Sequence, residues 1–312
     1  MSKRLSWRPK ARLIAAIGAE LVSSPKVALI ELVKNAYDAD ATEVVIRLSG
    51  RDKDEVLEII DNGTGMSAET VLDDWLVPAT PAKRRNTRTN RGRRVLGEKG
   101  IGRFAAATLG RRLELVTRRE GADEVVVRVN WDAFEDEDAF LDEVKVDFDT
   151  RQPLVFSGHG EGPDHGTLLR ISNLKFPWNE AFERDIRTAL ARLVSPFAQL
   201  SDFHVVLDIR GRREKIEPAG VLSRPLYRLK GEVGPDGSYQ VQISTPGGES
   251  PQTGVLKSGM SCGPFRIELR VWDRDRASLE PLAKALNRTI TDVRHDLDAA
   301  CGVSIYRDGF RV

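Results

Sequence analysis

Residues 31–41 read ELVKNAYDADA, and this stretch does most to decide the fold. It lies in a segment that Ser24-Pro25 opens, and serine at the N-cap followed by proline at the first helical position is typical of a helix start. At 100° per residue, Glu31, Asn35 and Asp38 fall within about 60° of one another on such a helix. The opposite side is apolar and holds Leu29, Leu32, Val33 and Ala36. The pattern predicts an amphipathic helix over 26–39.

The polar face of this helix has two interpretations. It is either a plain solvated face or a chemical site. Asparagine is a mediocre helix former that a solvated face has no reason to select. A glutamate and an asparagine one turn apart suit a site in which Glu31 orients a water and the Asn35 amide oxygen binds Mg²⁺. The helix alone leaves both interpretations open.

A second segment, DNGTGM over 61–66, follows the apolar strand predicted at 56–60. It can be a simple turn, since Asp, Asn and Gly are turn residues, but one turn needs only one glycine. A carboxylate at the end of a strand accepts a hydrogen bond from an exocyclic amine such as adenine N6, and a bond of this kind contributes about 1.5–3 kcal/mol. Gly63 and Gly65 would let a flat base approach the backbone closely.

The third segment is GEKGIGRF over 97–104. It lacks the Lys-Ser/Thr pair of a P-loop, and it has neither the order nor the βαβ setting of a dinucleotide fingerprint. A glycine-rich turn before a helix offers backbone N–H groups to an anion. Lys99 and Arg103 would add positive charge there.

In this order the three segments resemble the GHKL ATPases, the group of gyrase, heat-shock chaperones, histidine kinases and MutL. The stretch 31–41 resembles their N-box, 61–66 their first glycine box, GEKGIGRFAAATLG (97–110) their second, and GTLLRIS (166–172) their later Gly-Thr strand. Within the group the chain looks closest to MORC-like and ninety-kilodalton heat-shock-like ATPases. Residues 216–312 resemble the start of a transducer domain, which we expect to continue beyond residue 312.

The resemblance implies a role for each matching position. Glu31 matches the general base, Asn35 the Mg²⁺ ligand, and Asp61 the carboxylate that reads adenine, with Thr167 helping through a water. The other expected nucleotide contacts are Asp38, Gly63, Gly65, Met66, Lys99, Gly100, Ile101, Gly102, Arg103 and Phe104. By location only, Lys257 is the candidate for the transducer cation that reaches the γ-phosphate.

The resemblance also implies the architecture. We expect an α/β two-layer sandwich over 1–215, with a mixed, largely antiparallel sheet, helices on one face and a lid near 77–102. A partial α/β transducer-like domain follows over 216–312. The patterns predict helices at 11–22, 103–108, 179–193 and near 278–299, strands at 43–48, 56–60, 113–117, 167–172 and 203–209, and a final strand over 302–312.

Charge is informative only locally. The 312 residues carry 48 Lys and Arg against 47 Asp and Glu, so the net charge of +1 points to no partner. Residues 83–94, KRRNTRTNRGRR, hold seven basic residues and no acidic one. This segment is either a solvated lid that helps to retain triphosphate or a surface for a nucleic-acid backbone. It contains no aromatic residue, so base stacking is not indicated.

The remaining features exclude several classes of protein. Cys262 and Cys301 are far apart in the sequence, and we expect both to be reduced thiols. The cysteines and histidines do not have the spacing of a zinc site. The first apolar run is interrupted by Glu20 and is too short to span a bilayer, so neither a signal peptide nor a membrane segment is expected. These features predict a cytoplasmic protein, or a nuclear one in a eukaryote.

The resulting hypothesis is an ATPase whose homodimerisation is driven by ATP with Mg²⁺. It would form a clamp on DNA or on a protein client, with arm exchange near residues 1–20. One alternative is a nucleotide-sensing scaffold with negligible hydrolysis. A histidine kinase is less favoured, because its only candidate phosphoacceptor, His295, lies C-terminal to the ATP site and lacks the proline expected shortly after it.

Overall fold

The computed structural model describes residues 6, 8–77, 87–97, 104–158, 162–193, 202–256, 263–307 and 310–311. The chain divides into two compact units, and along the sequence the division falls between Ile216 and Glu217. Within the described ranges, no helix combines the length and the hydrophobicity that crossing a bilayer requires.

The first unit is built on an eight-stranded sheet in the order β5-β4-β3-β6-β2-β1-β7-β8. Its strands are β1 (Glu43–Ser49), β2 (Val56–Asp61), β3 (Gly110–Arg118), β4 (Glu124–Asn130), β5 (Asp147–Arg151), β6 (Gly166–Leu174), β7 (His204–Ile209) and β8 (Arg212–Lys215). Only β1 and β7 pair in parallel, and every other neighbouring pair is antiparallel. The sheet is therefore mixed and largely antiparallel, as predicted.

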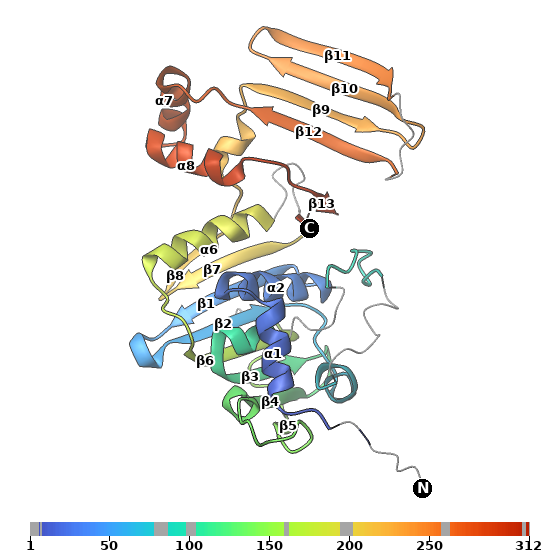
Figure 1. Ribbon diagram of the computed structural model, residues 1–312, viewed down its shortest axis with the longest axis vertical. Coiled ribbons are helices and arrows are strands. Elements are labelled where there is room, and N and C mark those ends of the chain that lie inside the picture. The colour runs from blue at the N-terminus through green and yellow to red at the C-terminus, as the bar shows by residue number, and fades with distance from the viewer. Residues whose placement is uncertain are drawn as a thin grey trace. The chain divides into compact units, whose positions relative to one another are not determined.

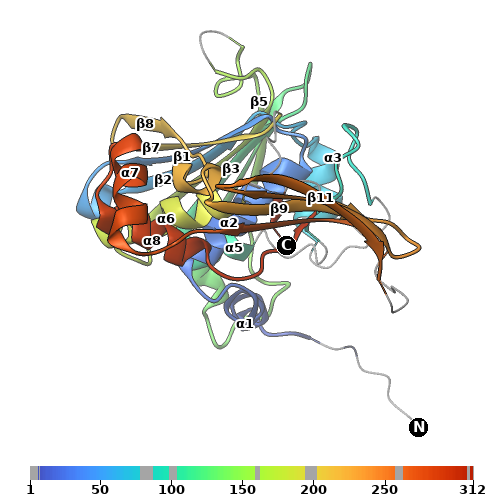
Figure 2. The same ribbon diagram turned by 90° about the horizontal axis from the view of Figure 1, so that it is seen from above.

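Helices cover one face of this sheet (Figures 1 and 2). They are α1 (Arg12–Leu21), α2 (Pro25–Asp38), α5 (Ala105–Leu109) and α6 (Glu180–Leu193), and short turns α3 (Ala68–Thr70), η2 (Val71–Trp75) and η4 (Trp131–Phe134) join the strands. The predicted apolar side of α2 is buried, with Ala28 and Tyr37 in addition to the expected residues. Val44, Ile46 and Leu48 of β1 are fully buried. The predicted α/β two-layer sandwich is confirmed.

The other face of the sheet carries a row of alternating charges. Arg47 on β1 lies opposite Glu58 on β2, and Glu58 lies opposite Arg170 on β6. Glu114 on β3 lies opposite Arg170 and also opposite Arg128 on β4. The guanidinium of Arg170 lies 2.9 Å from Glu58 and 2.5 Å from Glu114, and that of Arg128 lies 3.1 Å from Glu114. We call these five residues the charge row.

The second unit has a four-stranded antiparallel sheet in the order β11-β10-β9-β12. Its elements are η5 (Gly220–Ser223), β9 (Tyr227–Val233), β10 (Ser238–Thr245), β11 (Gly248–Val255), β12 (Phe265–Val271), α7 (Arg276–Ala285), α8 (Ile290–Ala300), β13 (Tyr306–Arg307) and β14 (Phe310–Arg311). The prediction of one helix near 278–299 was wrong, because Thr289 and Asp292 form a capping box that starts a second helix. The final strand expected over 302–312 is instead the short pair β13 and β14.

Candidate nucleotide-binding site

The polar side of α2 forms the first part of the site. Ser24 caps the helix by accepting a hydrogen bond from the Val27 amide at 3.3 Å, and Pro25 takes the first helical position. Glu31 is partly exposed and forms an ion pair with Lys34 at 3.0 Å. Asn35 and Asp38 are partly buried. The helix thus presents the predicted residues on the side away from its apolar face.

The end of β2 forms the second part. Asp61 lies opposite Thr167 on β6, and Thr167 lies opposite Thr117 on β3. Directly opposed residues point to the same face of a sheet, so the three side chains share the helix-covered face with buried Leu57 and Ile59. The hydroxyl oxygens of Thr117 and Thr167 are 3.1 Å apart, and Thr117 Oγ1 also accepts a hydrogen bond from the Met66 amide at 2.9 Å. The turn after β2 is thereby fixed to β3.

Gly63 and Gly65 are explained by close packing of protein backbone. A Cβ atom at Gly65, whose φ is +61°, would lie 1.9 Å from the carbonyl oxygen of Arg118. A Cβ atom at Gly63 would lie 2.6 Å from the carbonyl oxygen of Ala39. Neither position tolerates a side chain, so both glycines are required whether or not a base binds beside them.

Asp61 is a buried carboxylate at this end of the sheet. It is 7% exposed, and its Oδ1 accepts the Gly63 amide at 2.8 Å. Burial raises the pKa of Asp61 to about 6, against the opposing effects of the Gly63 and Thr167 amides and of His165. His165 Nδ1 lies 2.6 Å from the Gly63 carbonyl oxygen and so supports the same turn. A buried carboxylate whose pKa is raised by burial is a candidate for a ligand site.

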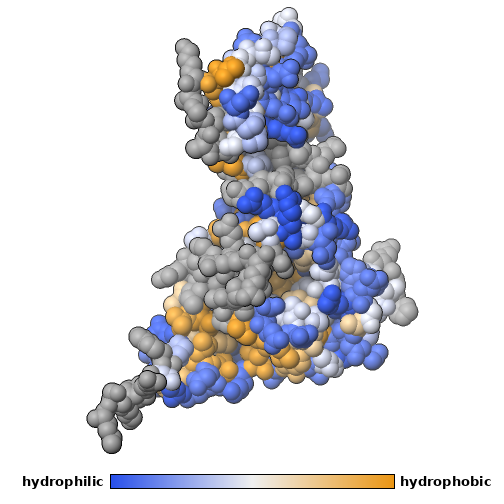
Figure 3. Space-filling view, turned by 90° about the vertical axis from the view of Figure 1, so that its right-hand side faces the viewer, coloured by the Kyte–Doolittle hydropathy of each residue, from blue (hydrophilic) through white to orange (hydrophobic). Residues whose placement is uncertain are grey.

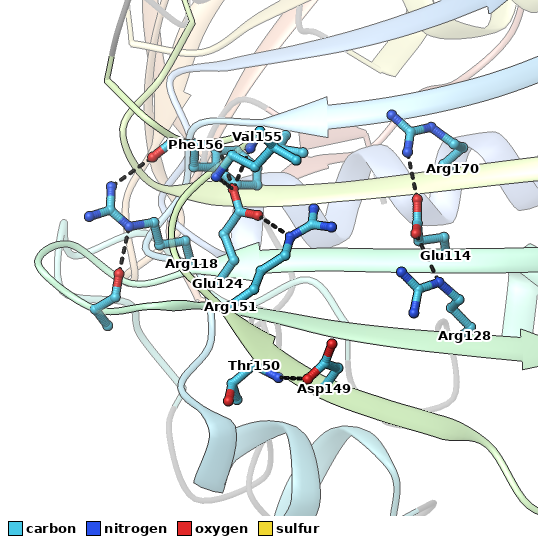
Figure 4. A network of polar contacts seen from close by, with 12 residues as sticks. Glu114, Arg118, Glu124, Arg128, Asp149, Thr150, Arg151, Val155, Phe156 and Arg170 are labelled. Atoms are coloured by element: carbon cyan, nitrogen blue, oxygen red, sulfur yellow. Dashed lines mark hydrogen bonds and ion pairs between the residues drawn. The ribbon is translucent and has the colours of Figure 1, made fainter.

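Glu124 is a contrasting carboxylate on the other face of the sheet, the face that carries the charge row and is here called the open face (Figure 4). Glu124 Oε1 accepts the amides of Leu154, Val155 and Phe156 at 2.5–2.9 Å, and its Oε2 lies 2.9 Å from Arg151. Burial alone would raise the pKa of Glu124, but these hydrogen bonds outweigh it and hold the pKa below its usual value. Glu124 is a saturated structural group.

The third predicted segment lies mainly outside the described residues. Lys99, Gly100, Ile101, Gly102 and Arg103 fall there, as does the transducer candidate Lys257. At the near end, the Leu96 and Gly97 amides donate to the two carboxylate oxygens of Asp38. At the far end, Phe104 is buried and its ring meets that of Trp131 edge to face.

A hollow of about 230 Å³ is lined by Asp61 and Asn62 together with Val45 and Ile60. Its lining includes Val45 and Ile60, which alternate with the residues of the helix-covered face. The hollow therefore extends on the face opposite the one that α2 covers, and Asp61 is among the residues that line it.

Three residues that shape the site were not predicted from the sequence. Thr117 and His165 hold the turn after β2, and Arg93 is buried at the C-terminal end of α2, where it donates to the Tyr37 and Ala41 carbonyl oxygens. A threonine in the apolar strand 113–117 was a usable signal for a buried polar contact. Arg93 could not be distinguished from the other basic residues of 83–94.

The comparisons with known proteins agree with this geometry. Residues 22–158 match the family described as histidine kinase-, DNA gyrase B-, and HSP90-like ATPase. The chain is 28% identical over 179 residues to "Putative type II restriction enzyme HgiDII" of Herpetosiphon aurantiacus, an alignment that covers 57% of this chain. It is 37% identical over 115 residues, 35% of this chain, to the DNA mismatch repair protein MutL of Deinococcus radiodurans. It is 28% identical over 132 residues, 36% of this chain, to the chaperone protein HtpG of Halorhodospira halophila. These alignments span between 19% and 27% of the relatives' own lengths.

A mixed, largely antiparallel sheet with helices on one face defines the first unit as an α/β two-layer sandwich. Together with these matches, it places the chain in the GHKL superfamily of ATP-binding domains. The closer relation to MORC-like and ninety-kilodalton heat-shock-like ATPases stays a prediction.

Proposed function

We propose that the first unit binds ATP with Mg²⁺ and hydrolyses it. Asp61 accepts the adenine amine, Thr167 supports that contact, and Glu31 takes the proton of the attacking water. Gly63, Gly65 and Met66 form the turn beside the base, and residues 97–104 bind the phosphates. The observation that carries this proposal is Asp61 itself, a buried carboxylate at the end of β2 on the face that α2 covers, whose pKa is raised by burial.

Asn35 is the proposed Mg²⁺ ligand. The described residues hold no group of three or more His, Cys, Asp or Glu that could enclose a metal ion. A single amide oxygen fits Mg²⁺, which commonly takes one or two protein ligands and completes its shell with phosphate oxygens and water. When bound, Mg²⁺ would neutralise charge on the phosphates.

Glu31 and Asp61 have separate tasks. As a carboxylate, Asp61 is an acceptor and matches the donor edge of adenine, which gives selectivity for the base. Glu31 lies almost two turns before the end of α2, where it pairs with Lys34 and keeps a partly exposed side chain that can orient a water. Phosphoryl transfer depends mainly on positioning and on charge neutralisation, which these residues supply.

Two measurements test the proposal. Calorimetry should show Mg²⁺-dependent binding of ATP that falls about 10–100-fold in Asp61→Asn, because a charge-assisted hydrogen bond is lost. Single-turnover hydrolysis should stop in Glu31→Ala while binding persists. An unchanged rate would remove Glu31 from its role, and binding without any hydrolysis in the wild type would favour the nucleotide-sensing scaffold.

We further propose that ATP drives homodimerisation. The basic arm at residues 8–12 docks on the acidic loop 135–143: Arg8 pairs with Glu143 at 3.1 Å and Arg12 with Glu137 at 2.7 Å. Backbone hydrogen bonds join Ala11 to Ala139 and Leu141 to Pro9. Hydrophobic residues gather on the first unit near the end where the chain begins (Figure 3), and exposed apolar side chains of this unit include Leu13 and Leu72. Such a surface supports a partner contact.

Sedimentation with a non-hydrolysable ATP analogue tests dimerisation. We expect a monomer without nucleotide and a dimer with it, and a monomer under both conditions would contradict the proposal. Arg12→Glu should weaken the dimer if the same docking is exchanged between two copies.

DNA is the macromolecular partner we favour, with a protein client as the alternative. The names of the MutL and restriction-enzyme relatives, together with the basic segment 83–94, support this choice. Arg88, Arg91 and Arg94 are exposed, whereas Arg93 is buried. The test is ATP-dependent DNA binding across a salt series, with every basic residue of 83–94 neutralised except Arg93. Loss of salt-sensitive binding is expected, and no DNA binding by the wild type would favour a protein client.

A further inference from the structure

The C-terminal end of α2 is tied to the segment that leads into the second glycine box. Asp38 Oδ1 accepts the Leu96 amide at 2.7 Å, and Asp38 Oδ2 accepts the Gly97 amide at 2.9 Å. Two residues later, Asp40 Oδ2 accepts the Arg91 amide at 3.2 Å. These carboxylates therefore hold the backbone of 91–97 from one side.

The buried side chain of Arg93, which belongs to the same segment, also fixes it to the rest of the unit. Its side chain is 5% exposed, and Nη1 donates to the carbonyl oxygens of Tyr37 at 3.2 Å and Ala41 at 2.6 Å. Its Nε and Nη2 donate to Asp202 Oδ2 at 3.1 and 2.7 Å. The guanidinium also lies over the Tyr37 ring, 4.5 Å from its centroid. The path of the chain up to Gly97 is thus fixed to the helix that bears Glu31 and Asn35.

The contacts of Asp38 indicate positioning. Each of its carboxylate oxygens accepts the amide of one of two successive residues, which sets both the position and the direction of the chain at Gly97. Hydrogen bonds to an ionised acceptor are about twice as strong as neutral ones. We propose that Asp38 is a positioning residue that places the start of the phosphate-binding segment relative to Glu31 and Asn35. This inference rests on the proposed function, because it requires the segment beginning at Gly97 to bind phosphates.

The base side of the site is built separately. Asp61, Thr117 and Thr167 are held by strand pairing and by the turn after β2, and these contacts do not involve Asp38. Loss of Asp38 should therefore weaken the contribution of the phosphates and leave recognition of adenosine unchanged.

The experiment compares ATP with Mg²⁺ and adenosine as ligands of the full chain, by calorimetry. In Asp38→Ala the affinity for ATP should fall about 10–100-fold, because two charge-assisted hydrogen bonds are lost, while the affinity for adenosine stays within about twofold. Asp38→Asn keeps one acceptor oxygen and should lie between the wild type and Asp38→Ala. An equal loss for adenosine and ATP, or no loss for either, would overturn the proposal.

Amide hydrogen exchange without nucleotide provides an independent readout. The Leu96 and Gly97 amides should exchange at least tenfold faster in Asp38→Ala than in the wild type, while amides of β2 and β6 are unchanged. Unchanged exchange at Leu96 and Gly97 contradicts the positioning role. If the wild type binds neither ATP nor adenosine, the proposed function fails. The exchange rates then still show whether Asp38 holds the Leu96 and Gly97 amides.

Discussion

Two buried carboxylates of the first unit, Asp61 on the helix-covered face and Glu124 on the open face, have opposite electrostatic situations. Glu124 accepts three backbone amides and an arginine, and its pKa is lowered. Asp61 has less support, and its pKa is raised to about 6. Glu124 is saturated by the loop that it holds in place, whereas Asp61, with fewer donors, is the carboxylate that we propose for ligand binding.

The largest effect is expected on stability, when Glu124 is replaced. Glu124→Ala leaves three amides and Arg151 without their acceptor, so we expect the free energy of unfolding to fall by about 3–5 kcal/mol. Urea unfolding followed by circular dichroism measures this loss. Glu124→Gln is the matched control; it keeps an acceptor oxygen and should lose less. If Glu124→Ala lowered the free energy of unfolding by less than an ordinary surface substitution does, Glu124 would not be the structural carboxylate that we contrast with Asp61.

Asp61→Asn should have the opposite effect. The pKa of Asp61 is higher in the folded than in the unfolded chain, so its charge destabilises the fold as pH rises from about 4 to 6. At pH 7 the substitution should therefore stabilise the unit, on the order of 1–3 kcal/mol, and at pH 4 it should have little effect. Urea unfolding at both pH values tests this. Destabilisation at pH 7 would make Asp61 a structural group like Glu124.

Nucleotide affinity should follow the protonation of Asp61. Below its pKa of about 6 the carboxylate takes up a proton and loses its charge, so a drop from pH 6 to pH 5 should weaken ATP binding by up to about tenfold. Calorimetry in buffers of matched ionic strength measures the trend. Asp61→Asn should abolish it, and a profile that persists in this variant would assign the titration to another group.

The smallest effect is expected in the charge row. Glu114 lies between Arg128 and Arg170, but both arginines are more than 40% exposed, so Glu114→Ala should lower the unfolding free energy by only about 0–1 kcal/mol. High salt should reduce the difference further. A loss as large as that of Glu124→Ala would show that exposure does not separate the two kinds of carboxylate.

The elements near the N-box were predictable, because their periodicity is strong and their boundaries carry capping residues. The predicted helix over 26–39 and the strands at 43–48 and 56–60 match α2, β1 and β2 to within one residue. The strands β4, β5, β8, β9 and β11 were not predicted. β5 reads DFDTR and β11 reads GESPQTGV, and their pairing partners rather than their own side chains make them strands. The parallel pairing of β1 with β7 is likewise absent from any local pattern.

The candidate site was predictable in residue type but only partly in arrangement. Placement of Glu31, Asn35 and Asp38 on one side of a helix follows from spacing alone. That Asp38 accepts two backbone amides and that Arg93 is buried depends on contacts more than fifty residues apart in sequence. A run of similar arginines carries no information on which member is buried.

The charge row has a consequence for assembly of the sheet. If β6 slipped by two residues along β2, its apolar side chains would stay on the covered face, and hydrophobic burial would hardly register the error. Arg170 would then face Val56 or Ile60 in place of Glu58. The charge row thus helps to specify the register of the strands. It disfavours register-shifted sheets that hydrophobic burial alone would tolerate.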